Sequence, residues 1–484
     1  MVKTIGNVQK DAQVRAVASG TLSNGDTVIV NSDGTVSAVA ETSITGDVGT
    51  PVIFSDANTR YNATAFDANS GKVVVAYMDV SESNEGNARV GTIDTSDNSI
   101  SWGAETTFET GDVMWLAGTY AETAQKVVFA YRDDSNAGYG TAVVGTVSGT
   151  TVTFGSPVVW AYTQVQYVDI TYDSANDRVV IVYEDDDNSD YGTSVVGTVS
   201  GSSISFGTPV VFESSASAWC AVEYDANAEK VLVAFKDGAV GDARVGTVSG
   251  TSISYGSNAV FANSTTDIIG VTYDSSAQKC VISYQDGGNG DKGTAIVATI
   301  SGTSVTFGTE VVFNNATTSN TIFPLYNTAA GKVVIAYRDT GGGNQGEFVT
   351  GTVSGTSITF DTAQEFESGT TNFISGAYDS TNNLIVLCYE DEGNSDKGTS
   401  VVVRNAYNEP NLTSDNFIGF ADGAYADTQN AVINTTCSVD RSQTSLTAGQ
   451  KYYVQTDGSL SETADDPSVE AGTAISSTEI LVKG

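Results

Sequence analysis

The chain has 484 residues, and its 21 Lys and Arg against 58 Asp and Glu give a formal net charge of 21 − 58 = −37. This acidic excess excludes the usual binders of nucleic acids and anionic membranes, which need a basic face to meet phosphate. The sequence contains no histidine, which excludes histidine-based catalytic triads and histidine zinc sites. Fifty glycines beside 40% hydrophobic and 16% charged residues indicate an ordered chain with many turns, and its length favours a repeat over one compact core.

The four cysteines, Cys220, Cys280, Cys388 and Cys437, are too few and too scattered for a disulfide framework, and none forms a C-x-x-C pair. We therefore expect buried thiols. The first residues lack the basic start and apolar run of a secretory signal, and no stretch reaches the roughly 18 apolar residues of a membrane helix. These features predict a protein that folds in a cytoplasm, with no membrane insertion and no nucleic-acid partner.

An aromatic-x-Asp triplet that ends an apolar run recurs along the chain and defines repeats one to seven. The triplets are Tyr77/Asp79, Tyr131/Asp133, Tyr183/Asp185, Phe235/Asp237, Tyr284/Asp286, Tyr337/Asp339 and Tyr389/Asp391. Their aromatic residues are 54, 52, 52, 49, 53 and 52 residues apart. A fixed period of about this length is typical of propeller blades or solenoid units.

Each repeat holds four short β-type runs bounded by turn residues, and repeat three shows them clearly. Its runs are 167–172, 178–183, 193–199 and 204–206, and the segment 207–212 leads to the next repeat. Four antiparallel strands repeated seven times, without a helical period between them, predict an all-β fold, a seven-bladed β-propeller. A closed ring also avoids the exposed end strands of a linear solenoid.

The two ends of the chain complete the predicted architecture. Repeat seven stops after its third run, and the N-terminal segments 42–45 and 49–54 resemble the missing return strand and linker. We therefore predict that the N-terminus completes the last blade. Residues 27–37 and 452–461 are both hairpin patterns centred on Asp-Gly, which predicts a small flanking β module. The predicted divisions are an N-terminal β segment at 1–47, a propeller at 48–404 and a C-terminal β module at 405–484.

The aspartate of each triplet is interpreted as structural, because a catalytic site is normally built once. We expect its side chain to accept backbone N–H bonds in the following turn. The loop of repeat three is richer in carboxylates than the others. Calcium takes about six to eight oxygen ligands, and Asp185, Asp187 and Asp190 can supply several of them. The alternative is a solvated acidic turn, and no other cofactor is expected.

In a propeller, the loops after the second and fourth runs lie on one face, which is therefore predicted to be strongly acidic. Unrepeated aromatic residues gather in the same parts of the sequence: Trp115, Tyr139, Trp160, Tyr162, Tyr167, Tyr191, Trp219 and Phe373. Such rings either fill the wedge between blades or, beside Asp and Asn, stack on sugars. Trp160, Tyr162 and Trp219 are predicted to be the most exposed. No carboxylate pair is singled out for glycoside hydrolysis, so no catalytic residue is predicted.

Near the C-terminus, Asn416-Phe417-Ile418-Gly419-Phe420-Ala421 is followed by residues 446–458 (LTAGQKYYVQTDG) and 471–484. This pattern resembles a terminal module of virion structural proteins from tailed bacteriophages, particularly marine and cyanobacterial ones. The Ser-Gly-Thr-Ser repeats upstream are similar to those of the same phage proteins.

The resemblance implies a virion location after assembly in the host cytoplasm, other capsid or tail proteins as partners, and a homo-oligomer. The terminal β segments would anchor the subunit to the particle, and the propeller would present its aromatic face to a host-surface glycan. A purely structural capsid or tail decoration protein is the main alternative. A glycan-degrading enzyme is the more remote one.

Overall fold

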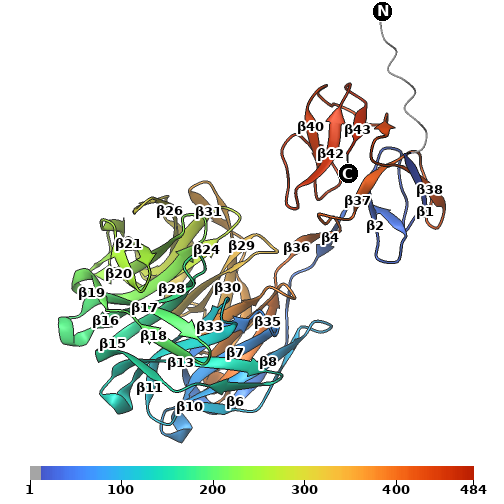
Figure 1. Ribbon diagram of the computed structural model, residues 1–484. Coiled ribbons are helices and arrows are strands. Elements are labelled where there is room, and N and C mark those ends of the chain that lie inside the picture. Colours follow the sequence, from blue (N-terminus) through green and yellow to red (C-terminus); the bar gives the residue numbers. More distant parts are fainter. Residues whose placement is uncertain (1–11, 484) are drawn as a thin grey trace, which may run out of the picture. The chain divides into compact units, whose positions relative to one another are not determined.

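The computed structural model describes residues 12–483 (Figure 1). These residues form 43 strands and five short 3-10 helices, and they contain no α-helix. The chain divides into two compact units, with residues 1–45 and 406–484 in unit 1 and residues 46–405 in unit 2. Within the described part of the chain, no helix is long and apolar enough to cross a membrane.

Repeat three shows how one sheet of unit 2 is built. Strands β15 (Val158–Asp173), β16 (Arg178–Asp185), β17 (Tyr191–Ser200) and β18 (Ser203–Phe206) pair antiparallel in this order, as the sequence predicts. The segment that leads onward differs from the prediction, because it is already the start of strand β19 (Val210–Asp225) and pairs with β17. The outer edge of β17 is therefore covered in two pieces, by β18 and by the start of β19.

The remaining repeats follow the same strand order. Their strands are β6 (Val52–Asp67), β7 (Lys72–Asp79), β8 (Glu85–Asp94), β9 (Ser99–Trp102), β10 (Thr106–Glu109), β11 (Val113–Ala121), β12 (Lys126–Asp133), β13 (Tyr139–Ser148), β14 (Thr151–Phe154), β20 (Lys230–Asp237), β21 (Val240–Ser249), β22 (Ser252–Tyr255), β23 (Ala259–Ala262), β24 (Thr266–Asp274), β25 (Lys279–Asp286), β26 (Lys292–Ser301), β27 (Ser304–Phe307), β28 (Val311–Asn327), β29 (Lys332–Asp339), β30 (Gln345–Ser354), β31 (Ser357–Phe360), β32 (Gln364–Glu367), β33 (Thr371–Asp379), β34 (Leu384–Asp391) and β35 (Lys397–Arg404). The 3-10 helices follow second strands: η1 (Val80–Glu82), η2 (Asp134–Asn136), η3 (Asp186–Asn188), η4 (Gly287–Asn289) and η5 (Glu392–Asn394).

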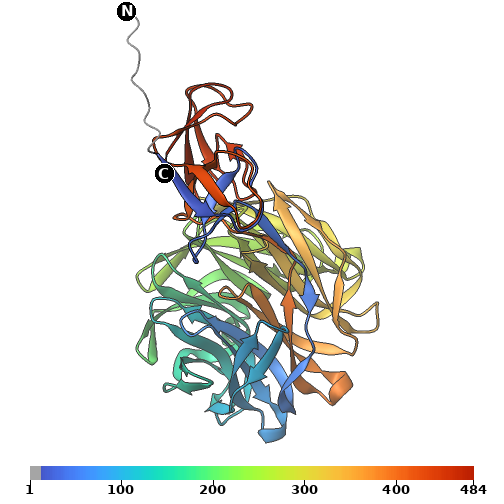
Figure 2. The ribbon, with the colours of Figure 1, turned by 90° about the vertical axis from the view of Figure 1, so that its right-hand side faces the viewer.

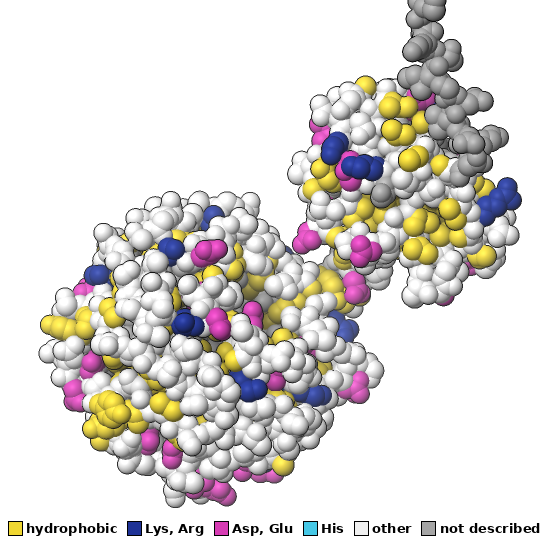
Figure 3. Space-filling view, viewed as in Figure 1, with side chains coloured by type: hydrophobic (Ala, Val, Ile, Leu, Met, Phe, Trp, Pro, Cys, Tyr) yellow, Lys and Arg dark blue, Asp and Glu magenta, His cyan; other side chains and the backbone are white. Residues whose placement is uncertain are grey.

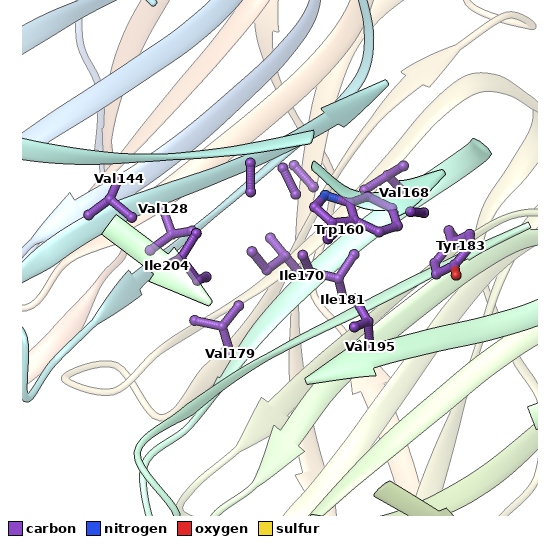
Figure 4. Close-up of a cluster of buried hydrophobic side chains, with 14 of the residues drawn as sticks. Val128, Val144, Trp160, Val168, Ile170, Val179, Ile181, Tyr183, Val195 and Ile204 are labelled. Carbon is purple, nitrogen blue, oxygen red and sulfur yellow. The ribbon is translucent and has the colours of Figure 1, made fainter. Parts of the chain in front are cut away.

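The first strand of each repeat lies beside the first strand of the next. Strands β6, β11, β15, β19, β24, β28 and β33 contact one another in this order, and β33 in turn contacts β6. The chain colours accordingly pass around unit 2 from blue to orange in Figures 1 and 2. Buried side chains from neighbouring repeats share hydrophobic clusters, such as the one between repeats two and three in Figure 4. Sheets that pack face to face around an axis in this way form a β-propeller.

The N-terminal part of unit 2 pairs with repeat seven. Strand β5 (Asp47–Val48) and the first residues of β6 both pair with β35. The predicted role of residues 42–45 is wrong, because β4 (Glu41–Ile44) pairs instead with β36 (Tyr407–Pro410) in unit 1. The reason is the length of β35, which has eight residues where β17 has ten. It therefore lacks the end to which a four-residue return strand would pair.

Unit 1 contains two five-stranded sheets, with strand orders β1-β38-β37-β2-β3 and β39-β43-β42-β40-β41. The strands are β1 (Gln13–Val17), β2 (Thr27–Val30), β3 (Val36–Ala38), β37 (Phe417–Ala421), β38 (Asn430–Asn434), β39 (Val439–Asp440), β40 (Lys451–Val454), β41 (Leu460–Ser461), β42 (Val469–Ala474) and β43 (Ile480–Val482). The two predicted hairpins are confirmed, since β2 pairs with β3 and β40 with β41. Ile29 of the first sheet shares a core with Tyr452 and Val454 of the second.

Three of the four cysteines are buried, as expected. The expectation is wrong for Cys437, which is exposed. This residue has a φ angle of 70° and lies between strands β38 and β39 of unit 1, where the chain turns at the surface.

Candidate functional site

A β-bulge interrupts the first strand of every repeat at the same place. In β15, for example, the register shifts between Gln166 and Asp169. The residue at the centre of each bulge has a φ between 47° and 64°. We call these residues the collar: Tyr61, Trp115, Tyr167, Trp219, Ile268, Asn320 and Phe373. A bulge turns a side chain out of the regular alternation of a strand. The left-handed backbone is costly for bulky residues, so the surrounding sheets must hold each of these positions in place.

Five collar residues form a continuous arc of aromatic rings. The ring centroids of Phe373 and Tyr61 are 4.9 Å apart, and those of Tyr61 and Trp115 are 5.4 Å apart. The arc continues from Trp115 to Tyr167 at 4.6 Å and from Tyr167 to Trp219 at 4.8 Å. The structure therefore brings together four of the predicted aromatic residues and adds Tyr61. The sequence signal for Tyr61 is its spacing, since it precedes Asp67 by the same interval that separates Tyr167 from Asp173.

The arc borders a cavity of about 630 Å³, which we call the mouth cavity. Four carboxylates line it: Asp267, Glu390, Glu392 and Asp396. Each of them accepts a hydrogen bond from a neighbouring side chain. Trp219 Nε1 donates to Asp267 at 3.0 Å, Asn372 Nδ2 donates to Glu390 at 2.9 Å and also to Glu392, and Asn58 Nδ2 donates to Asp396 at 3.1 Å.

A variable fringe, polar in six of the seven repeats, lies beside the collar. It consists of the middle residues of the triplets: Met78, Arg132, Glu184, Lys236, Gln285, Arg338 and Glu390. Each pairs with the residue that precedes a bulge, as Glu184 does with Gln166 and Glu390 with Asn372. Sequence reasoning missed this set, although a position that varies inside an otherwise repeated triplet is the signal that identifies it.

Two fringe carboxyl groups hold their protons more tightly than usual. Burial raises the pKa of Glu184 to about 8, and the nearby Asp186 carboxylate adds to the effect. Burial likewise raises the pKa of Glu390 to about 7, although Arg60 Nε lies 3.8 Å from its Oε1. On the face of unit 2 seen in Figure 3, acidic side chains are scattered among uncharged ones.

The remaining predicted aromatic residues lie outside the arc. The predicted exposure of Trp160 is wrong: it is 4% exposed, and its ring packs against Tyr183 at 4.7 Å (Figure 4). Trp160 fills the space left by Gly140, where an added Cβ would lie 2.5 Å from the indole. Tyr162 is 77% exposed, as predicted, and its ring lies 5.7 Å from that of Tyr139. Tyr191 is half-buried at the start of β17.

The structural role predicted for the triplet aspartates is confirmed in five repeats. Asp79, Asp133, Asp286, Asp339 and Asp391 accept backbone N–H bonds from the turn that follows. The other two aspartates accept hydrogen bonds from hydroxyl groups of the preceding segment. Thr163 Oγ1 donates to Asp185 at 2.5 Å, and Ser215 Oγ donates to Asp237 at 2.7 Å.

The loop of repeat three groups its carboxylates differently from the calcium prediction. Oxygen atoms of Glu184, Asp186 and Asp190 lie within 4.8 Å of one another, whereas Asp185 is bonded to Thr163 and Asp187 accepts the backbone N–H of Gln164 at 3.3 Å. The 3-10 helix η3 explains the difference, because its tight winding turns successive side chains in different directions. Calcium binding by Asp185, Asp187 and Asp190 stays a prediction.

Comparisons with known proteins find similarity among solved structures only. No family model and no curated protein matches the chain. The NanB sialidase of Streptococcus pneumoniae, in complex with a chlorobenzyl-ammonio-ethanesulfonate compound, is 11% identical with a TM-score of 0.46, over 73% of this chain and 70% of the sialidase chain. The Dos1 propeller is also 11% identical with a TM-score of 0.46, over 75% of this chain and 96% of its own.

Proposed function

We propose that this protein binds glycans through the mouth cavity of a seven-bladed β-propeller, and that it serves as a host-attachment component on the surface or tail of a phage virion. The observation that carries the binding proposal is the arc of five aromatic rings, four of which line a cavity of about 630 Å³. Each of the seven first strands contacts the next, and the last one, β33, contacts the first one, β6. This ring of contacts supports the count of seven blades.

The chemistry of the mouth suits a sugar. Ligand sites are concave, largely apolar, and supplied with a few polar groups that fix orientation. The collar rings offer flat faces to the CH groups of a pyranose, and the polar groups beside them offer partners to its hydroxyls. Arg60, whose side chain is 48% exposed, and the exposed Asn320 lie in the same lining. Two residues of the variable fringe, Gln285 and Glu390, also line the cavity, which makes its polar lining asymmetric.

We propose binding without hydrolysis. Glycosidases use two carboxyl groups about 5 to 10 Å apart, one of them free to attack or to activate water. All four carboxylates of the mouth cavity accept hydrogen bonds from protein side chains. Asp267 also lies 2.5 Å from the ammonium group of Lys236, with which it forms an ion pair. The proposal therefore rests on these hydrogen bonds and on the ion pair of Asp267. The raised pKa of Glu390 is a property that a general acid would share, so a test for sugar release is part of the experiment.

The virion role rests on the resemblance of the repeats and of the C-terminal segment to phage structural proteins. Unit 1 would anchor the subunit beside other virion proteins, and many copies would multiply weak single-site affinities. The alternative is a decoration protein of the capsid or tail that binds no ligand. Exposed apolar residues of unit 1, such as Val14 and Val17 on the edge strand β1, favour contacts with other subunits in either case.

The test is binding of the purified protein to intact bacterial cells and to an array of bacterial envelope glycans. Trp115→Ala should abolish binding because it breaks the arc at its centre, while the matched variant Tyr162→Ala should bind as the wild type does. Circular dichroism checks that both variants fold. Equal binding by the two variants would overturn the mouth as the site, and an absence of binding to any cell or glycan would favour the decoration protein. Release of sugars from a bound glycan would overturn the non-catalytic assignment.

A further inference from the structure

A second cavity lies in unit 2 and shares Trp115 and Trp219 with the mouth cavity. We call it the chamber. Its volume is about 390 Å³, and Tyr167 also lines it. Its other walls come from the first strands of the repeats, which include β15 and β19. Three aromatic rings of the collar therefore border a space that the proposed glycan site does not use.

Two carboxyl groups face the chamber from neighbouring strands. Asp169 accepts the backbone N–H of Val222 at 2.8 Å and that of Ile170 at 2.8 Å. Glu223 accepts the backbone N–H of Tyr224 at 2.8 Å and the hydroxyl of Thr171 at 3.2 Å. Protein surrounds both carboxyl groups, and the two residues keep a small exposed fraction where they line the chamber. Burial raises the pKa of Asp169 to about 6 and that of Glu223 to about 7.

No counter-charge is present among the residues that line the chamber. They include no Lys or Arg, and neither carboxyl group takes part in an ion pair within the described residues. The other titratable groups there are the Cys220 thiol and the Tyr167 phenol, and burial raises the pKa of both. Buried charges in proteins are normally paired or bound to a cation. The protein supplies no cation to the two carboxyl groups of the chamber, so a positively charged ligand could take that place.

Separate polar groups of the chamber lining also lack partners. Asn62 Oδ1, Thr64 Oγ1 and Ser375 Oγ are buried without a hydrogen-bond partner, and the exposed fractions of these residues are 6%, 7% and 3%. They come from β6 and β33, whereas the carboxyl groups come from β15 and β19. A buried polar atom without a partner costs free energy, so the lining of the chamber carries polar groups whose hydrogen bonds the protein does not supply.

We propose that the chamber binds a small organic cation of the ammonium class, with its charge beside Asp169 and Glu223 and its alkyl groups against Trp115, Tyr167 and Trp219. Aromatic faces attract ammonium groups through their quadrupole, and Trp is the strongest of them. A divalent metal ion would instead need a shell of about six oxygen ligands, whereas three of the side chains that line the chamber are aromatic residues of the collar. This proposal does not depend on the glycan at the mouth.

The test is isothermal titration calorimetry of the full-length protein at pH 8 with choline chloride and with tetramethylammonium chloride. Wild-type protein should bind both saturably, while 3,3-dimethyl-1-butanol, the uncharged analogue of choline, should show at least tenfold weaker binding. Asp169→Asn and Glu223→Gln should each weaken choline binding at least tenfold. The matched control Asp242→Asn removes a buried carboxyl group of repeat four, which does not line the chamber, and should bind choline as the wild type does.

Several results would overturn the proposal. Wild-type protein that shows no saturable binding of either cation, or that binds the uncharged analogue equally well, has no ammonium site. Unchanged affinity in both single variants would remove the carboxyl groups from the site. A titration with calcium chloride distinguishes the remaining possibility, since calcium binding that needs both carboxyl groups, without choline binding, would identify a metal site. Quenching of tryptophan fluorescence by choline gives a second readout, and thermal melts verify that each variant is folded.

Discussion

Trp219 Nε1 donates a hydrogen bond of 3.0 Å to Asp267 Oδ1 and so links the first strand of repeat four to that of repeat five. Lys236 Nζ lies 2.5 Å from the same oxygen. The carboxylate therefore holds an indole of the collar in place and pairs with a cation of the fringe. One side chain from the neighbouring repeat thus fixes the orientation of a ring that borders both cavities.

Replacing Asp267 should show how far the collar depends on this link. Asp267→Ala leaves both the indole N–H and the Lys236 ammonium without this partner, which should cost about 1–3 kcal/mol of unfolding free energy. Asp267→Asn keeps an acceptor for Trp219 and should cost less. Urea unfolding measures the free energies, and the glycan array measures binding. Equal losses in the two variants would contradict the role of the hydrogen bond.

Trp160 occupies a position at which the other repeats carry phenylalanine, each packed on a glycine of a third strand. The equivalent pairs are Gly86–Phe108, Gly192–Phe212, Gly241–Phe261, Gly293–Phe313, Gly346–Phe366 and Gly398–Phe54. Trp160→Phe should therefore cost less than about 1.5 kcal/mol, and Trp160→Ala about 3–5 kcal/mol because it leaves a cavity. The exposed Tyr162→Ala should change stability by no more than about 0.5 kcal/mol. Denaturant unfolding that ranks these variants differently would contradict the packing role.

Much of the fold could be predicted because the repeat places the same turn residues and apolar runs at a fixed period. The burial of Trp160 was also readable: residues 157–160 are Pro-Val-Val-Trp and residues 209–212 are Pro-Val-Val-Phe, so the tryptophan replaces a core phenylalanine. Trp160 was predicted to be exposed because it is an unrepeated aromatic residue, whereas its position in the repeat is a buried core position.

The collar could be predicted only in part. Four of its aromatic rings were recognised as unrepeated residues, but the bulges that turn them inward depend on how two strands pair, which a single strand does not reveal. Asp169 and Glu223 escaped notice for a related reason. They lie inside apolar runs that predict ordinary strands. The chamber that they line forms only where the first strands of several repeats pack side by side.

The buried carboxyl groups predict how stability depends on pH. In the unfolded chain Asp169 ionises near the ordinary aspartate pKa of 3.8, and in the folded protein burial raises its pKa to about 6. The folded state therefore binds more protons in this window, and the free energy of unfolding should fall as the pH rises from about 4 to 8. The contribution of Asp169 is at most about 3 kcal/mol, from about 1.4 kcal/mol per pKa unit.

The double variant Asp169→Asn and Glu223→Gln removes two of these carboxyl groups. The free energy of unfolding should therefore depend less on pH in this variant than in the wild type. The melting temperature of the variant minus that of the wild type should increase from pH 5 to pH 8.5. The reason is that only the wild type must ionise these side chains in the chamber. Melting curves by circular dichroism at several pH values measure the difference. A constant difference in melting temperature across this range would contradict the raised pKa values.

The pairing of the N-terminal part of unit 2 with β35 predicts different outcomes for two truncations. Residues 46–405 contain every strand of unit 2, so this fragment should fold alone and melt as unit 2 does in the full chain. A fragment of residues 59–405 lacks β5 and the start of β6, which exposes the edge of β35. It also loses Phe54, which is 1% exposed and packs on Gly398.

The shorter fragment should therefore melt well below the longer one, since loss of a buried phenylalanine alone costs about 3–5 kcal/mol. Differential scanning calorimetry compares the two fragments, and the longer one is the control for removing unit 1. Equal melting temperatures would mean that the pairing of the first and last repeats contributes little to stability. In the shorter fragment only the sheet of repeat seven loses its outer partner. If this fragment is unfolded while the longer one is folded, the stability of the other sheets must depend on that of repeat seven.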